Sequence, residues 1–369
     1  MTAIPDKIQA WQMIRPWSKD KETGTAIPGE LARVDIPVPE LAEGDVLVEV
    51  AGCGVCHTDL GYFYDGVNTV SEPPLALGHE ISGTVIAGKQ EAIGKNVIIP
   101  AVLPCNDCPI CAIGRGNRCL TQKMPGNSMG VQGGFSSHIV VPFQDLCVID
   151  DLKGKSLSHY SVVADAVTTP YQAAVRASLT EGDRVIIIGC SGGVGIYMTQ
   201  VAAALGAGTI IGIELGAEKL ERALNLGANF GIDSTGKTPR DIQDEFRDIC
   251  KSNRLPHNYG WKIFEVTGSG AGQAIALQLL SFVGKLMVVG FGLQKNEYSI
   301  SRLMAFDAEM IGTWGCLPKY YPKVLDLVQS GKIQIDSLIE ARPMSTIEKA
   351  FEDAHSGKLK RRIILESDF

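Results

Sequence analysis

Short apolar runs alternate with longer amphipathic helical patterns from Arg184 onward, and this alternation constrains the fold more than any other feature. The apolar runs are Val185–Ile188, Thr209–Ile213, Ile263–Val266 and Lys285–Val289. One helical pattern between them ends near Ala202, and two others lie near Lys219–Leu226 and Gln273–Leu280. Parallel strands need a crossover connection, usually a helix. The pattern therefore predicts an α/β fold, with a doubly wound parallel sheet that carries helices on both faces.

The N-terminal part of the chain has a different pattern. Between about Ala10 and Pro142, short β-branched runs are separated by glycine and proline, as in Asp45–Val50, Ile81–Ala87 and Asn96–Ile99. Such runs predict a mostly β domain with irregular loops. Irregular sequence returns from about Ser299, where we expect the chain to leave the parallel sheet. For 369 residues we predict two domains, residues 1–160 and 161–300, with residues 301–369 returning to the first.

Charge and hydropathy exclude several classes of partner. The net charge is −7, whereas a nucleic-acid-binding protein needs a dense basic surface, so we expect no nucleic acid partner. One local basic cluster consists of Lys358, Lys360, Arg361 and Arg362. It is either the solvent-exposed end of a helix or strand or a site that binds an anion. No apolar run is long enough to span a bilayer, and the N-terminus lacks the pattern of a signal peptide. We expect a cytoplasmic protein that does not bind membranes.

Four cysteines stand in one short stretch of the N-terminal half. They are Cys105, Cys108, Cys111 and Cys119. Four thiolates at this spacing can close a tetrahedron around one zinc ion, and a site with four protein ligands has no open position for a substrate. The spacing therefore predicts a structural zinc site in a reducing compartment. Any catalytic chemistry has to lie elsewhere.

A glycine-rich turn follows the apolar run Val185–Ile188 and precedes a helical pattern. Its glycines are Gly189, Gly192, Gly193 and Gly195. Such a turn lets the backbone approach a pyrophosphate, which then rests at the positive end of the helix. Glu214 ends the next strand, where a carboxylate accepts both hydroxyls of an adenosine ribose and repels a 2′-phosphate. These features favour NAD over NADP; the alternative is a tight turn in some other α/β sheet with Glu214 merely exposed.

A second set of metal-ligating residue types is spread through the chain. Cys56, His79 and Asp165 offer a thiolate, an imidazole and a carboxylate. Three protein ligands leave one zinc position open for water or substrate. Without analogy to known proteins, the sequence favours an ordinary exposed or capping aspartate at Asp165. Cys53 and Cys56 also form a C-x-x-C pair, which is typical of redox dithiols, but no thioredoxin-like β-α-β pattern follows it.

With these motifs assembled, the chain resembles the zinc-dependent medium-chain alcohol dehydrogenases over essentially its whole length. The resemblance implies a GroES-like catalytic domain with a structural zinc lobe and a Rossmann domain that binds NAD. It also implies two zinc ions per chain, with Cys56, His79 and Asp165 at the catalytic zinc and the four-cysteine cluster at the structural one. Many relatives have cysteine where this chain has Asp165, and the exchange of sulfur for oxygen should make the metal a stronger Lewis acid.

The resemblance also assigns roles to residues around these motifs. Thr58 matches the hydroxyl that takes the substrate proton, Asp59 matches the partner that orients His79, and Glu80 matches an acid beside the zinc. The implied cofactor contacts, in addition to the glycines and Glu214, are His57, Val194, Lys219 and Arg361, with Arg362 as a substitute for Arg361. The relay histidine of liver-type enzymes would fall at Gly61, so the proton has to leave through Thr58, the ribose hydroxyl and water.

Within that family, the chain is most similar to the 6-hydroxycyclohex-1-ene-1-carbonyl-CoA dehydrogenases of anaerobic aromatic degradation. The similarity lies in W-Q-M-I-R-P-W near the N-terminus and G-Y-F-Y-D-G-V after the cysteine ligand. It implies that NAD oxidises a cyclic allylic alcohol, carried as a CoA thioester, to the 6-oxo compound. Candidate cations for the CoA phosphates are Arg115, Arg118 and Lys123, which are otherwise ordinary surface charges.

Three other functions stay open at this point. One is a zinc alcohol dehydrogenase acting on simple secondary or primary alcohols. A second is a zinc-free enone or quinone reductase, which the cysteine cluster and Glu214 oppose, and a third is a non-enzymatic nucleotide-binding regulator. The resemblance also implies a homodimer or homotetramer formed through the last strand of the nucleotide sheet, near Tyr298–Ile300 or Met310–Gly315.

Overall fold

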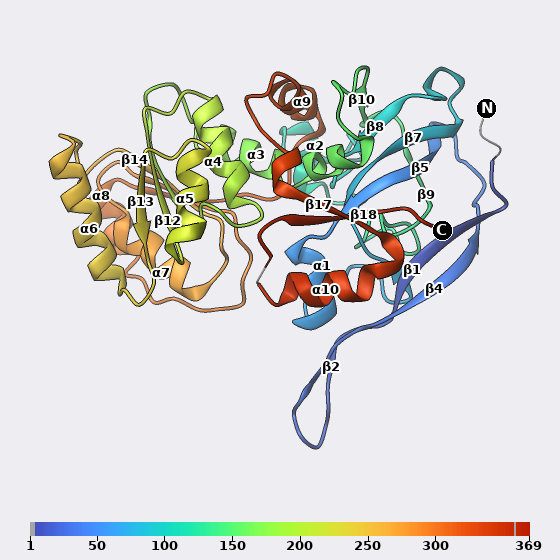
Figure 1. Ribbon diagram of the computed structural model, residues 1–369, viewed down its shortest axis with the longest axis horizontal. Helices are drawn as coiled ribbons and strands as arrows, with labels where there is room; N and C mark the ends of the chain where they lie inside the picture. The colour runs from blue at the N-terminus through green and yellow to red at the C-terminus, as the bar shows by residue number, and fades with distance from the viewer. Residues whose placement is uncertain (1–3, 358) are drawn as a thin grey trace. The chain divides into compact units, whose positions relative to one another are not determined.

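The computed structural model describes residues 4–357 and 359–369, which form two compact units (Figure 1). The first unit runs to residue 168 and also contains residues 315–329 and 334–369. The second unit contains residues 169–314 and 330–333. The chain therefore leaves the first unit for the second and later returns to it.

A mixed sheet of seven strands is the main element of the first unit. Its strands in spatial order are β10 (Cys147–Ile149), β8 (Asn96–Ile99), β7 (Glu80–Gly88), β5 (Asp45–Gly54), β18 (Arg362–Glu366) and β17 (Ile339–Pro343), with β9 (His138–Pro142) also paired to β5. A smaller antiparallel sheet has the order β4 (Glu30–Pro37), β1 (Lys7–Arg15) and β6 (Leu75–Ala76). The predicted β-rich first domain is thus confirmed.

Apolar side chains cover both faces of β5 and β7. One buried cluster includes Val48, Val50 and Val85, and a second includes Leu47, Ile86 and Ala87. Val48, Val50 and Val85 are at most 2% exposed. The C-terminal strand β18 lies antiparallel to β5, with Leu365 opposite Cys53. Helices pack around these strands: α1 (His57–Tyr64), α2 (Pro109–Ala112), α9 (Tyr321–Gln329) and α10 (Ile347–His355). Short 3₁₀ helices are η1 (Gln90–Ala92), η2 (Gly116–Arg118), η3 (Leu157–Ala164), η4 (Pro318–Tyr320), η5 (Asp336–Leu338) and η6 (Met344–Thr346).

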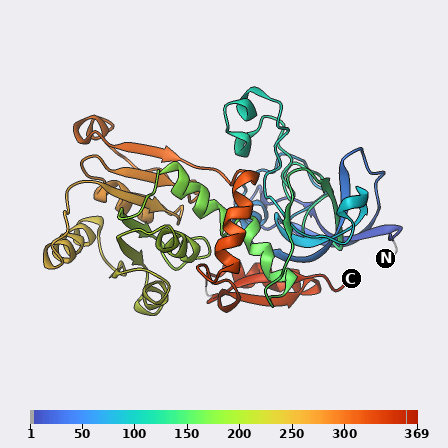
Figure 2. The same ribbon diagram turned by 90° about the horizontal axis from the view of Figure 1, so that it is seen from above.

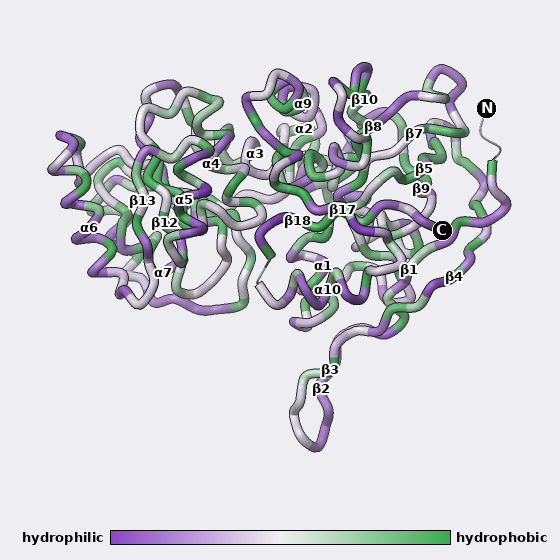
Figure 3. The backbone as a smooth tube through the Cα atoms, viewed as in Figure 1, coloured by the Kyte–Doolittle hydropathy of each residue, from purple (hydrophilic) through white to green (hydrophobic). Residues whose placement is uncertain are grey.

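A hairpin of β2 (Ser18–Lys19) and β3 (Ala26–Ile27) stands away from the rest of the first unit. It is coloured mostly purple and white in Figure 3, because polar residues dominate it.

Among the described residues, no helix combines the length and the apolar character needed to cross a membrane.

The second unit is built on a six-stranded sheet in which every pair is parallel. Its strands in order are β13 (Phe230–Asp233), β12 (Thr209–Glu214), β11 (Arg184–Ile188), β14 (Trp261–Glu265), β15 (Lys285–Val288) and β16 (Glu309–Gly312). The helices are α3 (Thr168–Arg176), α4 (Gly195–Ala204), α5 (Ala217–Asn225), α6 (Pro239–Ser252), α7 (Gly270–Leu279) and α8 (Ser301–Phe306). All residues of β12 are buried, as expected of a central parallel strand. The predicted doubly wound sheet is confirmed.

The end of this sheet differs from the expectation. The sequence suggests that the chain leaves the sheet from about Ser299, but β16 still pairs with β15, with Met310 opposite Leu286. The chain therefore leaves the sheet after Gly312. The sequence resemblance did indicate a last strand near Met310–Gly315, which agrees with β16. The apolar pattern alone did not, because β16 is short and partly exposed and starts with Glu309. Residues Phe230–Asp233 and Pro239–Ser252 form a strand and a helix that the sequence analysis did not single out.

Candidate metal centres and nucleotide site

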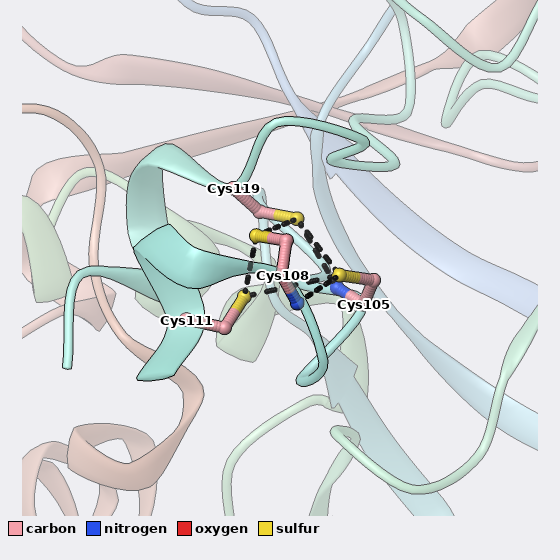
Figure 4. A group of neighbouring side chains, drawn as sticks. All are labelled: Cys105, Cys108, Cys111 and Cys119. Carbon is pink, nitrogen blue, oxygen red and sulfur yellow. Dashed lines mark hydrogen bonds between the residues drawn. The ribbon is translucent and has the colours of Figure 1, made fainter. Parts of the chain in front are cut away.

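The four cysteines converge in a lobe that protrudes from the strands of the first unit, in teal in Figure 2. Cys108 precedes α2, Cys111 lies within it, and Cys119 follows η2. Figure 4 shows the four sulfur atoms facing one another. The Sγ–Sγ distances are 3.4 Å for Cys105–Cys119, 3.5 Å for Cys108–Cys111, 3.7 Å for Cys108–Cys119 and 4.0 Å for Cys105–Cys111.

These distances fit a tetrahedral zinc site. Zinc–sulfur bonds of about 2.3 Å in a tetrahedron place the sulfurs about 3.8 Å apart. The lobe also stabilises thiolates, because the backbone N–H of Asp107 donates to the Sγ of Cys105 at 3.5 Å and that of Cys108 donates to it at 3.3 Å. These hydrogen bonds, led by that of Asp107, lower the pKa of Cys105 to about 6. The donor set therefore fits a zinc ion.

Cys56, His79 and Asp165 lie together although they are far apart in the sequence. Cys56 precedes α1, His79 precedes β7, and Asp165 follows η3. The Oδ2 of Asp165 is 3.8 Å from the Sγ of Cys56 and 3.5 Å from the Nε2 of His79. Zinc ligands with bonds of about 2.0 to 2.3 Å are separated by such distances, so the geometry fits a three-ligand zinc site.

Asp59 organises the first two of these residues. Its carboxylate accepts hydrogen bonds from the backbone N–H groups of Cys56 and Gly78, both at 3.0 Å. Its Oδ1 also lies 3.4 Å from the Nδ1 of His79. The carboxylate thereby faces one ring nitrogen of His79 and leaves the Nε2 directed toward Asp165, which is the arrangement that the sequence resemblance implies for Asp59.

The electrostatics around His79 call for a positive charge at this point. Burial lowers the pKa of this imidazole, but the charges of Asp59 and Cys56 outweigh burial and hold the pKa well above its ordinary value. His79 is 1% exposed and Asp59 is fully buried. A cluster of buried acidic groups of this kind needs a cation, and a bound metal ion would supply it.

Glu80 pairs with Arg362 beside the metal ligands. The Nε of Arg362 donates to Glu80 Oε2 at 2.8 Å, and the Nη2 donates to Oε1. The two side chains are 6% and 0% exposed. A Cβ on Gly54 would lie 2.1 Å from Glu80 Oε2, so this position of β5 has to be glycine for the pair to fit. Arg361 is exposed, so Arg362 is the inward arginine at this position, and the role given to Arg361 stays a prediction.

Replacing Arg362 with alanine is expected to lower the free energy of unfolding by about 3–5 kcal/mol, because the buried Glu80 carboxyl would lose its partner. Urea titration measures this change. Arg361→Ala is the matched control, since an exposed substitution usually changes stability by no more than about 0.5 kcal/mol. Equal losses in the two variants would show that the pair with Glu80 does not stabilise the fold.

The other residues predicted near the catalytic metal lie at the start of α1. The Oγ1 of Thr58 is 3.6 Å from the Sγ of Cys56, so this hydroxyl lies next to the ligand set. His57, the first residue of α1, is exposed. Gly61 is buried within α1. The structure thus brings Thr58 next to Cys56, and the role that the resemblance gives to its hydroxyl stays a prediction.

The redox dithiol interpretation of Cys53 and Cys56 is disfavoured. Cys53 is fully buried in β5. Burial and the nearby Asp59 charge raise the pKa of its thiol well above the ordinary value. A thiol of this kind is a poor nucleophile, because the thiolate is the reactive form.

The glycine turn of the second unit lies between β11 and α4, as predicted. Gly189 has a φ of 82°, which favours glycine. A Cβ on Gly195 would lie 1.7 Å from the carbonyl oxygen of Gly189, so the turn can close only with glycine at this position. Gly192 is exposed, and a Cβ there would meet only the same carbonyl, at 3.6 Å. The backbone at Gly192 is therefore open to a ligand, and the turn fits a pyrophosphate.

Glu214 ends β12 and bonds to this turn. Its Oε2 accepts hydrogen bonds from the backbone N–H of Ser191 at 2.9 Å and from the Ser191 hydroxyl at 3.0 Å. Its Oε1 accepts one from the N–H of Leu215 at 2.9 Å. Arg222 of α5 donates to the carbonyl of Ser191. Sequence analysis missed Ser191 and Arg222; the position of Ser191 within the glycine turn was the available signal.

The remaining predicted side chains that the structure describes are exposed, except that of Val194, which is half-buried. Lys219 is exposed on α5, and Val194 precedes α4. Arg115, Arg118 and Lys123 are exposed in and beside the four-cysteine lobe. In the basic cluster, Lys360 and Arg361 are exposed, and Lys358 lies outside the described residues.

Comparisons with known proteins agree with this site. The family model of the alcohol dehydrogenase GroES-like domain matches residues 42–151, and that of the zinc-binding dehydrogenases matches residues 193–330. An NAD-dependent alcohol dehydrogenase of Sulfolobus acidocaldarius is 31% identical over 350 residues, covering 92% of this chain and 97% of the relative. A sorbitol dehydrogenase of Bacillus subtilis is 30% identical, over 82% of this chain and 84% of the relative.

The fold is also that of solved dehydrogenases. The galactitol-1-phosphate dehydrogenase of Escherichia coli superposes with a TM-score of 0.82 at 22% identity, covering 97% of this chain and 99% of that chain. The predicted enzyme class, an oxidoreductase with zinc and NAD as cofactors, is confirmed at the level of the family. The chain belongs to the zinc-dependent medium-chain alcohol dehydrogenases.

Proposed function

We propose that this enzyme oxidises an alcohol with NAD at a zinc site held by Cys56, His79 and Asp165, and that the four-cysteine cluster holds a second, structural zinc. The observation that carries this proposal is the convergence of the three ligand atoms, with the Asp165 carboxylate within 3.8 Å of both other donors. Three ligands leave one position open for an alcohol oxygen. The zinc-free reductase and the regulator are not favoured, because the chain carries both metal-ligating sets.

The bound zinc would lower the pKa of the alcohol, and NAD would accept a hydride from it. Thr58 lies next to Cys56 and is placed to take the proton of the alcohol hydroxyl. Asp59 holds the orientation of His79 through its contacts with Cys56, Gly78 and the imidazole. The Glu80–Arg362 pair keeps a second carboxylate in place beside the ligands. These residues supply the orientation and the proton acceptor for the reaction.

For the substrate, we propose 6-hydroxycyclohex-1-ene-1-carbonyl-CoA, oxidised to the 6-oxo compound in anaerobic aromatic degradation. Support comes from the sequence resemblance near the N-terminus and after Cys56, and from three exposed cations for the CoA phosphates, Arg115, Arg118 and Lys123. The second candidate is a simple alcohol or a polyol. It is favoured by relatives that are named sorbitol dehydrogenase, from Bacillus subtilis and Rattus norvegicus.

A substrate panel separates these candidates. Cyclic hydroxyacyl-CoA esters, sorbitol and simple secondary alcohols are assayed with NAD by the absorbance of NADH. A higher kcat/KM for the CoA ester than for the matching CoA-free acid would support the CoA proposal. Loss of that preference in a triple variant, Arg115→Ala/Arg118→Ala/Lys123→Ala, would show that these cations bind the CoA group. If sorbitol or simple alcohols react and CoA esters do not, the substrate proposal fails while the dehydrogenase assignment stands.

Glu214 is expected to exclude NADPH, because its carboxylate would face the 2′-phosphate of that cofactor. We expect NADH to bind at least ~10-fold more tightly than NADPH, and Glu214→Gln to reduce this ratio to a few-fold. Fluorescence titration of the two reduced cofactors measures both dissociation constants. Glu221→Gln, an exposed change on α5, is the control. An unchanged ratio in Glu214→Gln would contradict the role of Glu214.

We also propose a cytoplasmic homodimer or homotetramer. The cytoplasm supplies the reducing conditions that free cysteine thiolates need. For assembly, the support is that β16 lies at the end of the six-stranded sheet and carries Met310, which is 41% exposed. An exposed strand edge is a template for pairing with another strand. Light scattering in solution gives the number of chains.

A further inference from the structure

The hydroxyl of Tyr321 joins three segments of the first unit. Tyr321 begins α9 and is 0% exposed. Its hydroxyl accepts a hydrogen bond from the backbone N–H of Ala101 at 3.1 Å and donates one to the backbone carbonyl of Ala164. Ala101 follows β8, and Ala164 ends η3. A buried hydroxyl in this place satisfies one backbone donor and one backbone acceptor that have no access to water.

The carbonyl that Tyr321 holds belongs to the peptide bond leading into Asp165. The same oxygen accepts a second hydrogen bond, from the hydroxyl of Thr168 at 3.1 Å. Thr168 begins α3 and is fully buried. Asp165 lies between η3 and α3, with φ −142° and ψ −57°, so neither helix contains it. The Ala164–Asp165 peptide is thus fixed by two side-chain hydroxyls outside regular secondary structure.

We infer that Tyr321 is a positioning residue for the catalytic metal, because its hydroxyl fixes the peptide that aims the Asp165 carboxylate at Cys56 and His79. Rotation of that peptide would move the carbon from which the carboxylate projects, and metal ligands have to keep their distances to within about 0.2 Å. The inference rests on the proposed role of Asp165 as a ligand. The described hydrogen bonds of the Tyr321 hydroxyl go to backbone groups of Ala101 and Ala164, so we assign it a role that acts through Asp165.

The test is Tyr321→Phe, which keeps the buried ring and removes only the hydroxyl. Two zinc sites in one chain provide an internal comparison. We expect the variant to release one zinc at a chelator concentration that leaves the other bound, with ~10–100-fold weaker affinity at the catalytic site, the usual effect of losing a group that orients a metal ligand. With Co²⁺ in place of the catalytic zinc, we expect the visible absorption of the site to change.

Tyr160→Phe is the matched control. Tyr160 is also fully buried in the first unit, but its hydroxyl donates to the carbonyl of Leu152, at 2.8 Å, and not to that of Ala164. It is expected to leave zinc affinity and the Co²⁺ spectrum unchanged. Thr168→Val removes the other hydroxyl on the Ala164 carbonyl and is expected to weaken the same zinc. If Tyr321→Phe does not fold, Thr168→Val decides the question.

The outcomes separate this inference from the proposed function. Asp165→Asn is the reference: if it keeps both zinc ions with unchanged affinity, Asp165 is not a ligand and the proposed ligand set fails. If Asp165→Asn loses the catalytic zinc while folded Tyr321→Phe and Thr168→Val keep it at wild-type affinity, the role of Tyr321 alone is overturned. Equal weakening of both zinc sites in Tyr321→Phe would also overturn it, because the effect would then be general destabilisation.

Discussion

Exchange of Asp165 for asparagine is expected to remove zinc from the catalytic site and to lower kcat/KM by ~10³-fold or more. The amide keeps the shape of the carboxylate but not its charge. Cys56 and His79 would remain as ligands, and the nearby Glu80 carboxylate is already bonded by Arg362. Loss of the metal removes several kcal/mol of transition-state stabilisation, and each ~1.4 kcal/mol is a factor of ten in rate. Metal analysis should find one zinc per chain, and NADH absorbance gives the rate.

Asp165→Cys is the control for this experiment. A thiolate restores an anionic ligand, and the sequence resemblance indicates that many relatives carry cysteine at this place. We expect the variant to bind two zinc ions and to keep part of the activity, with a weaker Lewis acid at the metal because sulfur donates more charge. Full activity and full zinc content in Asp165→Asn would refute the ligand role.

Exchange of Cys108 for serine is expected to remove the structural zinc and to destabilise the first unit. Zinc binding by four thiolates contributes directly to folding, with ~10–16 kcal/mol available in isolated zinc-binding peptides. If zinc binding contributes only ~3–5 kcal/mol to the stability of the first unit, losing it should lower the thermal midpoint by ~10 °C. Circular dichroism follows unfolding, and activity is measured well below the midpoint. We expect activity per folded chain to stay near the wild-type value.

The matched control is Cys147→Ala, which removes a cysteine of the same unit that belongs to neither metal-ligating set. Cys147 is 4% exposed in β10, so the change deletes a small buried group. It should lower the midpoint by only a few degrees and leave two zinc ions in place. A Cys108→Ser variant as stable as Cys147→Ala would show that the cluster does not support the fold. Loss of activity without loss of stability would show that the lobe acts directly in catalysis.

Local motifs were the most predictable part of this protein. The four cysteines lie within one short stretch, so their spacing alone predicts that the sulfur atoms can meet. The glycine turn is equally local, because strand, turn and helix follow one another in the sequence. The helical patterns and apolar runs that form β11, β12, β14 and β15 also reflect local periodicity. In these cases the interacting residues are close neighbours along the chain.

Long-range juxtapositions were less predictable. Cys56, His79 and Asp165 come from three separate segments, and only the family resemblance brought them together before the fold was known. Tyr321 supports Asp165 from a segment that lies 156 residues further along the chain, and no local pattern indicates that contact. Periodicity describes which face of an element is buried, and it does not state which distant residue covers that face.

Adjacent residues at the start of a strand are also hard to distinguish from the sequence. Arg361 and Arg362 are neighbours at the start of β18, and the sequence resemblance favoured Arg361 for a role at the site. Successive side chains of a strand point to opposite faces, so a shift of one residue exchanges the inner and the outer arginine. In the fold, Arg362 turns inward to Glu80, whereas Arg361 is exposed. Charge and composition do not distinguish two adjacent arginines; the pairing of β18 does.

The pairing of β18 with β5 also orders the events of biosynthesis. The N–H of Val55, next to the ligand Cys56, donates to the carbonyl of Ile363 at 3.0 Å, so the sheet beside the catalytic ligands is incomplete until the last strand has left the ribosome. All six strands of the parallel sheet, by contrast, lie between Arg184 and Gly312 and emerge earlier. Because domains fold as they emerge, we expect the parallel sheet to form on the nascent chain before β18 is available to complete the sheet beside Cys56.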